Sequence, residues 1–243
     1  GRRGGLTRVA LGRLAELGDE VEGAIDPVEE EEVLQPPEKR VPLNARRHDT
    51  VHQVLLDLGA RSVIDLGCGS GQFLDRLAKT SSFTRIAGSD VSTRSLQYAA
   101  RRLHIDRMSE RQADRVQLFQ SALTYEDERY AGFDAAVLME VVEHVDPPRL
   151  EALEGVVFGT AKPGAVIVTT PNGEYNALYE GLVGMRHPDH RFEWTRAEFA
   201  GWADHVASTY GYALERRGIG DLDDTLGTPT QMAIFTRKEA SDD

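Results

Sequence analysis

The chain has 243 residues, of which 40% are hydrophobic and 28% charged, as in an ordinary soluble globular protein. The net charge of −12 weighs against a nucleic-acid binder, because such proteins are usually basic, although it leaves room for a local basic groove. No apolar run approaches the ~20 residues of a membrane-spanning helix, and the single cysteine, Cys68, excludes an internal disulfide, so we expect a cytoplasmic protein without a membrane partner.

The sequence predicts two parts. Residues 1–40 combine a short helical pattern with an acidic stretch that runs to Pro36-Pro37. This composition is typical of an N-terminal extension that acts as an acidic linker or a docking arm. Residues 41–243 carry the regular patterns of a folded domain.

Helical and strand patterns alternate from Leu43 onward. We expect helices at 45–59, 70–80, 92–105, 147–161 and 195–211, and strands at 61–67, 84–90, 115–122, 133–140, 165–172, 212–220 and 230–237. This order predicts an α/β fold with a doubly wound, mostly parallel, seven-stranded Rossmann-like sheet. In such sheets, ligands bind at the carboxyl ends of the strands.

The stretch "VIDLGCGSGQF" places glycines 67, 69 and 71 between the first strand and its helix. The spacing differs from the Gly-x-Gly-x-x-Gly of dinucleotide sites, which disfavours a dehydrogenase. Asp65 precedes the loop, and Asp90 ends the second strand, where a carboxylate can accept ribose hydroxyls. The combination resembles motif I of class I S-adenosylmethionine-dependent methyltransferases. That resemblance implies that Asp65, Gly67, Gly69 and Asp90 bind S-adenosylmethionine.

The segment "LFQSALTYED" follows the third strand. By its position in this fold, it should flank the adenine of the cofactor, with Ser121 or Ala122 near the ring.

The fourth strand ends in "EVVEH", Glu140 to His144. In one helical turn, Glu140, Glu143 and His144 would share a face. The cluster could be a metal site, an acid/base pair or a solvated cap. Downstream, His187 and His190 lie in a proline-containing, non-helical segment, and a histidine from it could complete a four-ligand shell.

The stretches "EVVEHVDPPRLEALEGVVFG", "VTTPNGEYN" and "RHPDHRFEWTRAEF" resemble the small-RNA 3′-terminal ribose 2′-O-methyltransferases. The likeness is greatest to the bacterial arm, which works beside a polynucleotide kinase and ligase in RNA repair. This resemblance implies that Glu140, Glu143, His144 and His190 form the catalytic site and bind Mg²⁺ or Mn²⁺. The family more often has a Gly-Ser pair where this chain has Ser121 and Ala122, which weakens their assignment as cofactor contacts.

The resemblance implies a mechanism in which the metal binds the free 2′,3′-diol of the RNA 3′ end. A divalent cation lowers the pKa of a bound hydroxyl, and either His144 or His187 would take its proton. Tyr175 or Trp194 could stack on the last base, with core packing as the alternative for Trp194. Rival hypotheses are a small-molecule O-methyltransferase acting on a catechol or quinone precursor, and a scaffold for the repair enzymes.

Overall fold

The computed structural model describes residues 41–238, so the predicted extension at 1–40 lies outside the described residues. All seven predicted strands are present. They are β1 (Ser62–Leu66), β2 (Arg85–Asp90), β3 (Val116–Gln120), β4 (Ala135–Met139), β5 (Ala165–Pro171), β6 (Tyr212–Ile219) and β7 (Thr230–Arg237). The helices are α2 (Leu43–Asp57), α3 (Gln72–Ala78), α4 (Thr93–Arg102), α5 (Glu110–Ala113), α6 (Leu150–Glu154) and α7 (Arg196–Tyr210).

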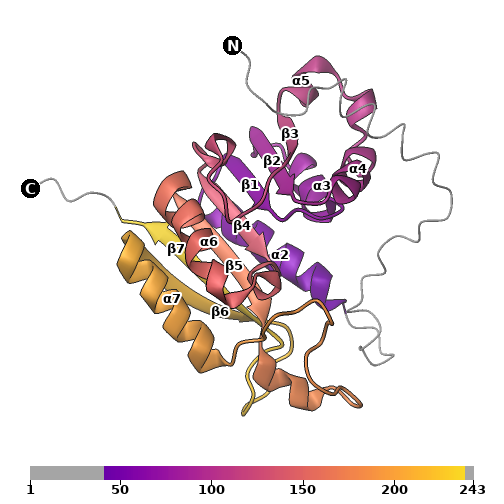
Figure 1. The fold of residues 1–243 in the computed structure, drawn as a ribbon. Coiled ribbons are helices and arrows are strands. Elements are labelled where there is room, and N and C mark those ends of the chain that lie inside the picture. Colours follow the sequence, from indigo (N-terminus) through magenta and orange to yellow (C-terminus); the bar gives the residue numbers. More distant parts are fainter. Residues whose placement is uncertain (1–40, 239–243) are drawn as a thin grey trace, which may run out of the picture.

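The strands form one sheet in the order β3-β2-β1-β4-β5-β7-β6 (Figure 1). Strands β1 to β5 are parallel, whereas β7 runs antiparallel to both β5 and β6. The predicted fold class is therefore confirmed. Because the chain order reverses between β1 and β4, the carboxyl ends of these two strands border the switch point where such sheets bind ligands.

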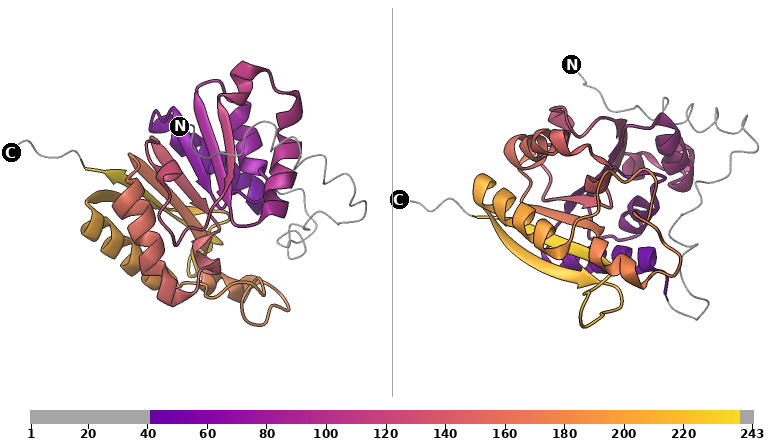
Figure 2. Two further views of the ribbon diagram at one scale, coloured as in Figure 1. Left: turned by 45° about the horizontal axis from the view of Figure 1, so that its top comes forward. Right: turned by 60° about the horizontal axis from the view of Figure 1, so that its bottom comes forward.

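Both faces of the sheet are covered by helices (Figures 1 and 2). On one face, the apolar core contains Val51 from α2, Leu74 from α3 and Leu96 from α4. On the other face, Leu153 from α6 and Phe199 from α7 belong to a second core. Strands covered on both faces need apolar side chains on both sides, which explains the uninterrupted hydrophobic run of β4.

Apart from shifts of about two residues at the ends of α2 and α3, the helices differ from the prediction in three places. The helix after β2 ends at Arg102 and is followed by a 3₁₀ turn. The helix predicted at 147–161 is α6 continued by a π-helical segment, Gly155–Ala161. The short α5 was not predicted, although Ser109 and Gln112 form a capping box there. Within residues 41–238, no helix has both the length and the apolar composition needed to cross a bilayer.

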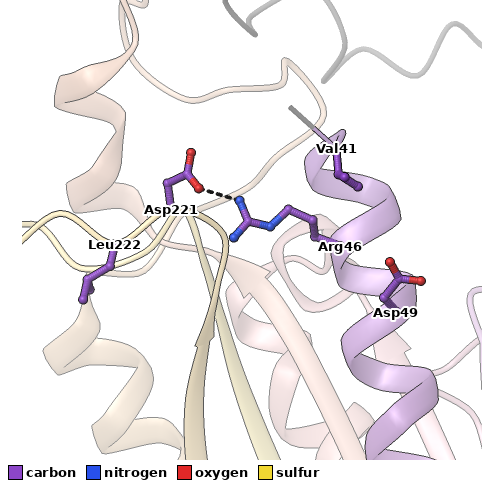
Figure 3. A pocket seen from close by; sticks show the side chains of 5 residues that line it. All are labelled: Val41, Arg46, Asp49, Asp221 and Leu222. Atoms are coloured by element: carbon purple, nitrogen blue, oxygen red, sulfur yellow. Dashed lines mark hydrogen bonds and ion pairs between the residues drawn. The ribbon is translucent and has the colours of Figure 1, made fainter. Parts of the chain in front are cut away.

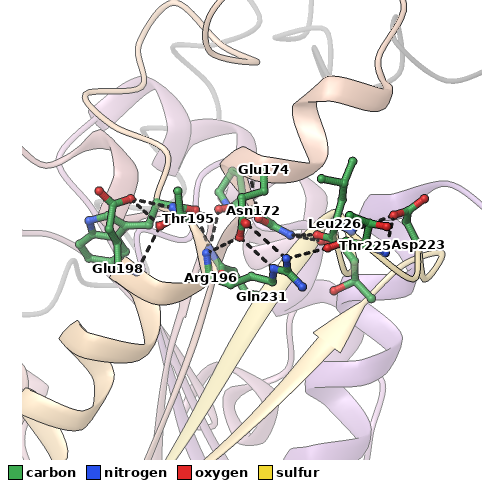
Figure 4. A network of polar contacts seen from close by, with 12 residues as sticks. Asn172, Glu174, Thr195, Arg196, Glu198, Asp223, Thr225, Leu226 and Gln231 are labelled. Carbon is green, nitrogen blue, oxygen red and sulfur yellow. Dashed lines mark hydrogen bonds and ion pairs between the residues drawn. The ribbon is translucent and has the colours of Figure 1, made fainter.

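The connection between β5 and α7 is tied to the loop that precedes β7 (Figure 4). The Asn172 side chain donates to the backbone oxygens of Leu226 and Thr228 at 2.8 and 2.9 Å. Arg196, at the start of α7, pairs with Glu174 at 2.8 Å. These contacts fix both ends of the long segment that carries His187 and His190.

Candidate active site

The glycine loop after β1 is held in conformations that suit glycine. Gly67, Gly69 and Gly71 have φ values of 81°, 52° and 79°. The backbone N–H groups of Gly67 and Cys68 both donate to the oxygen of Ser89, at 2.8 and 2.9 Å, so the loop is fastened to β2. A Cβ on Gly67 would lie 2.8 Å from Cγ2 of Val141, which leaves no room for a side chain between the loop and the end of β4.

Two carboxylates lie beside this loop at the ends of β1 and β2. Asp65 is buried, and its burial together with the charge of Asp90 raises the pKa of Asp65 to about 7. Asp90 accepts hydrogen bonds from the backbone N–H groups of Gly69, at 3.0 Å, and Ser92, at 2.8 Å. Asp90 therefore stays at the mouth of the loop, beside the start of α4, whose N-cap Ser92 accepts from the Ser95 N–H.

Ser121 and Ala122 directly follow β3. The backbone N–H of Ser121 donates to the backbone oxygen of Asp90 at 3.1 Å, so this segment lies beside the end of β2. The Ser121 hydroxyl donates to Asp127 at 2.8 Å. A side-chain hydrogen bond from Arg129 is the main cause that lowers the pKa of Asp127 to about 2. The hydroxyl is thus used within the protein, and the role of Ser121 and Ala122 in cofactor binding stays a prediction.

The "EVVEH" segment is not the single helical turn that its spacing indicates. Glu140 has a φ of 54°, in the left-handed region, and only Val142–His144 form a 3₁₀ turn. The Glu140 carboxylate accepts from the Thr169 hydroxyl at 2.9 Å and pairs with Arg47 of α2 at 3.1 Å. A left-handed non-glycine residue costs about 1–3 kcal/mol and is common at functional sites.

Glu143 lies fully inside the protein. One carboxylate oxygen accepts from the Thr170 hydroxyl at 2.9 Å, while the other, Oε1, is buried without a hydrogen-bond partner. Burial, reinforced by the charge of Glu140, raises the pKa of Glu143 well above its ordinary value. An unpartnered buried carboxylate oxygen is costly to maintain, which makes Glu143 a strong candidate ligand for a cation.

Three imidazoles meet at the end of the "EVVEH" turn. Each of the three residues His144, His187 and His190 offers a ring nitrogen that lies within 4.8 Å of the other two. Among residues 41–238, this is the cluster of potential metal-binding side chains that the structure brings together. The ring centroids of His144 and His190 are 4.8 Å apart. Although His144 reaches the surface, desolvation of its ring and the nearby His190 and His187 lower its pKa.

The predicted ligand set is therefore only partly assembled. His144 and His190 belong to the imidazole group, whereas Glu140 and Glu143 do not. His187 joins it as well; the residues alone left open which of His187 and His190 would complete the shell, and the family resemblance implied His190. The three-residue spacing of the histidines in "HPDH" is the signal that could have indicated this.

The histidine segment is held against the "EVVEH" turn by its backbone and by a buried carboxylate. The Arg191 N–H donates to the Glu143 backbone oxygen at 2.7 Å. His190 Nδ1 lies 2.6 Å from Glu193 Oε1. Burial raises the pKa of Glu193, but hydrogen bonds from His190, Asn176 and Arg186 outweigh it and lower the pKa overall. The sequence reasoning did not single out Glu193.

The aromatic side chains of this segment divide into two groups. Trp194 packs on Phe192 and Trp202, with ring centroids 4.4 and 5.1 Å apart, which favours core packing over base stacking. Tyr175 contacts Tyr179 at 5.9 Å, and the Arg186 guanidinium lies 5.0 Å from the Tyr179 ring centre. Tyr175 thus stays a candidate for contact with a base.

A separate open hollow of about 650 Å³ lies between α2 and the loop after β6 (Figure 3). Its lining includes Arg46, which donates to Asp221 at 2.6 Å, and the exposed side chains of Val41 and Leu222. None of the predicted site residues lines it.

Comparisons with known proteins give a consistent result. Residues 64–167 match the family model described as "Methyltransferase domain". The methyltransferase domain of the bacterial protein CtHen1 is 51% identical in a solved structure, with a TM-score of 0.75, and the match covers 81% of this chain and 100% of that one. A chain of the Pnkp1/Rnl/Hen1 RNA repair complex is 27% identical with a TM-score of 0.60, over 81% of this chain and 42% of that one.

Among curated proteins, the small RNA 2′-O-methyltransferase of Gallus gallus is 34% identical over 206 residues. The match covers 81% of this chain and 54% of the relative. The chain thus spans about half the length of the curated relatives that it matches.

Proposed function

The chain belongs to the small RNA 2′-O-methyltransferase family, and on that premise we propose that it methylates the 2′-hydroxyl of the 3′-terminal ribose of an RNA, using S-adenosylmethionine and Mg²⁺ or Mn²⁺. The substrate would be an RNA 3′ end with a free 2′,3′-diol. The similarity to a chain of an RNA repair complex supports a polynucleotide kinase and ligase as partners.

The observation that carries this proposal is the imidazole group beside Glu143. Nitrogen donors from two separate segments lie within 4.8 Å of one another, and Glu143, outside this group but next to His144 in the chain, has a buried oxygen without a partner. We propose Glu140, Glu143, His144 and His190 as metal ligands and catalytic residues. Such mixed nitrogen and oxygen donors suit Mn²⁺ better than Mg²⁺. The ion would supply Lewis acidity toward the ribose hydroxyls.

We propose the glycine loop as the S-adenosylmethionine site. The backbone at Gly67 and Gly69 can approach the amino-acid end of the cofactor closely because neither residue has a side chain. Asp65 would face the same end, and Asp90 would accept the ribose hydroxyls. Ser121 and Ala122 would border the adenine. Residues 41–243 would form the methyltransferase domain and residues 1–40 an extension outside it.

Besides holding the ion, the protein's own groups would orient the nucleophile and accept its proton. Desolvation of its ring and the nearby His190 and His187 lower the pKa of His144, and it could accept the proton of the 2′-hydroxyl only if its lone pair did not bind the ion. His187, at a ring distance of 5.9 Å from His144, is the other candidate base. A 3′-phosphate would remove the free diol and block the reaction.

The test is methyl transfer from labelled S-adenosylmethionine to matched RNAs that end in a 3′-hydroxyl or a 3′-phosphate. We expect transfer only to the 3′-hydroxyl RNA, dependence on added Mn²⁺, and loss in His190→Ala. The exposed His205 on α7 provides a matched control, since His205→Ala removes an imidazole outside the group. Activity that persists in EDTA would refute the metal requirement, and preference for a catechol would favour a small-molecule enzyme.

A further inference from the structure

Glu193 and His190 form a buried pair in the segment before α7. Their side chains are only 3% and 7% exposed, and Glu193 Oε1 lies 2.6 Å from His190 Nδ1. A carboxylate can only accept hydrogen bonds, so the proton between them belongs to Nδ1 of the imidazole. In the neutral ring, the lone pair is then left on Nε2.

His187 has the opposite arrangement. Its Nδ1 accepts a hydrogen bond from the backbone N–H of Asp189 at 3.0 Å, which places the proton of the neutral ring on Nε2. Two neighbouring histidines of one group are therefore held in different tautomers. Of these two histidines, His190 is the one that offers its outer nitrogen as a lone pair.

The Glu193 carboxylate is itself held from several sides. Its Oε1 also accepts from the backbone N–H of Arg186 at 2.7 Å, and its Oε2 accepts from the Asn176 side chain. Arg186 in turn donates to Asn176 Oδ1 at 2.5 Å and to the Asn172 oxygen at 2.7 Å. Because three donors converge on it, the carboxylate has little freedom to turn away from the imidazole.

We infer that Glu193 is a positioning residue that fixes the Nδ1-protonated tautomer and the ring orientation of His190, so that Nε2 is presented to a cation. This inference rests on the proposed function for the role of the cation, but the tautomer follows from the protein alone. A carboxylate behind a ligating imidazole also raises its basicity, and loss of such a partner typically weakens metal binding by about 10–100-fold.

The experiment is a long-range ¹H–¹⁵N NMR spectrum of the full chain, labelled at histidine and free of metal, at a pH where the imidazoles are neutral. We assign the His190 signals from the spectrum of His190→Gln. We expect the Nδ1-protonated pattern for His190 in the wild type and its loss in Glu193→Ala, which removes the acceptor. Calorimetric titration with Mn²⁺ alone should show a Kd raised about 10-fold or more in that variant.

Asn176→Ala is the matched control, because it removes another hydrogen bond to the same carboxylate and leaves the His190 contact in place. We expect it to keep the tautomer. Nε2-protonated His190 in the wild type would overturn the inference, even if Glu193→Ala failed to fold. A tautomer that switched equally in both variants would overturn it too. A wild type with the expected tautomer that binds no Mn²⁺ would instead count against the proposed function.

Discussion

Asp65 is a buried carboxyl group whose ionisation opposes folding. Its pKa is raised from 3.8 to about 7 by burial and by the charge of Asp90. The pKa of Asp65 is thus higher in the folded than in the unfolded protein. Below pH ~4 the carboxyl group is protonated in both states, so it does not lower the stability there. As the pH rises from ~4 to ~7, only the unfolded state releases the proton, and stability is lost.

The size of this loss follows from the shift. The pKa of Asp65 rises from 3.8 to about 7, and each tenfold change in acidity corresponds to about 1.4 kcal/mol. The free energy of unfolding lost above pH 7 is therefore about 4 kcal/mol, as an upper bound. Asp65→Asn keeps the shape and removes the charge. We therefore expect the variant to be more stable than the wild type by about 2–4 kcal/mol at pH 8 and equally stable near pH 4. In a protein of this size, that corresponds to roughly 10 °C in Tm.

The measurement is urea unfolding of both proteins between pH 4 and 8 without S-adenosylmethionine. Asp134→Asn provides a control of opposite sign. Asp134 accepts from the backbone N–H groups of Arg61 and Ser62 at 2.8 and 2.9 Å, and these bonds outweigh partial burial and lower its pKa. We expect Asp134→Asn to be less stable than the wild type at neutral pH, with the difference shrinking as the pH falls into the acid range.

A stability difference for Asp65→Asn that does not change with pH would refute the reasoning, because a purely steric effect has no such dependence. A variant that is less stable than the wild type at pH 8 would show that the carboxylate has stabilising partners in solution. Either result would remove the argument that ionisation of Asp65 opposes folding.

Three further predictions concern the same loop. In urea unfolding, Gly71→Ala should lower the free energy of unfolding by about 1–3 kcal/mol more than Gly59→Ala does. Both glycines have positive φ, but only a Cβ at 71 would meet a neighbour, the Cβ of Ala99 at 2.8 Å. Equal losses would contradict this contact. The Cys68 thiol is buried, and burial together with nearby carboxylates raises its pKa. A disulfide reagent should therefore modify this thiol only at the rate at which the protein unfolds. Rapid labelling of the native protein would contradict this. Asp90→Asn removes the charge of the carboxylate that accepts from the Gly69 N–H and that we propose accepts the ribose hydroxyls of the cofactor. Calorimetry should then show roughly 10–100-fold weaker S-adenosylmethionine binding, and an unchanged Kd would exclude Asp90 as a contact.

The sequence by itself determined the features that depend on near neighbours along the chain. Apolar runs of strand length separated by amphipathic helices predicted the seven strands, since each pattern records which side chains a strand or helix must bury. The cap at Ser92 and the turn at the glycine loop were also local, because a side-chain oxygen and a missing Cβ act within a few residues.

The tertiary structure decided which distant groups meet. Glu140 is left-handed and paired with Arg47, although its spacing from Glu143 suggested a shared helical face. His187 joined the imidazole group, and Glu193 was found behind His190. The order of the strands and the course of the segment between β5 and α7 set these contacts. No short-range sequence pattern encodes the strand order or that course, because hydrogen bonding and burial between remote segments exist only once the sheet has formed.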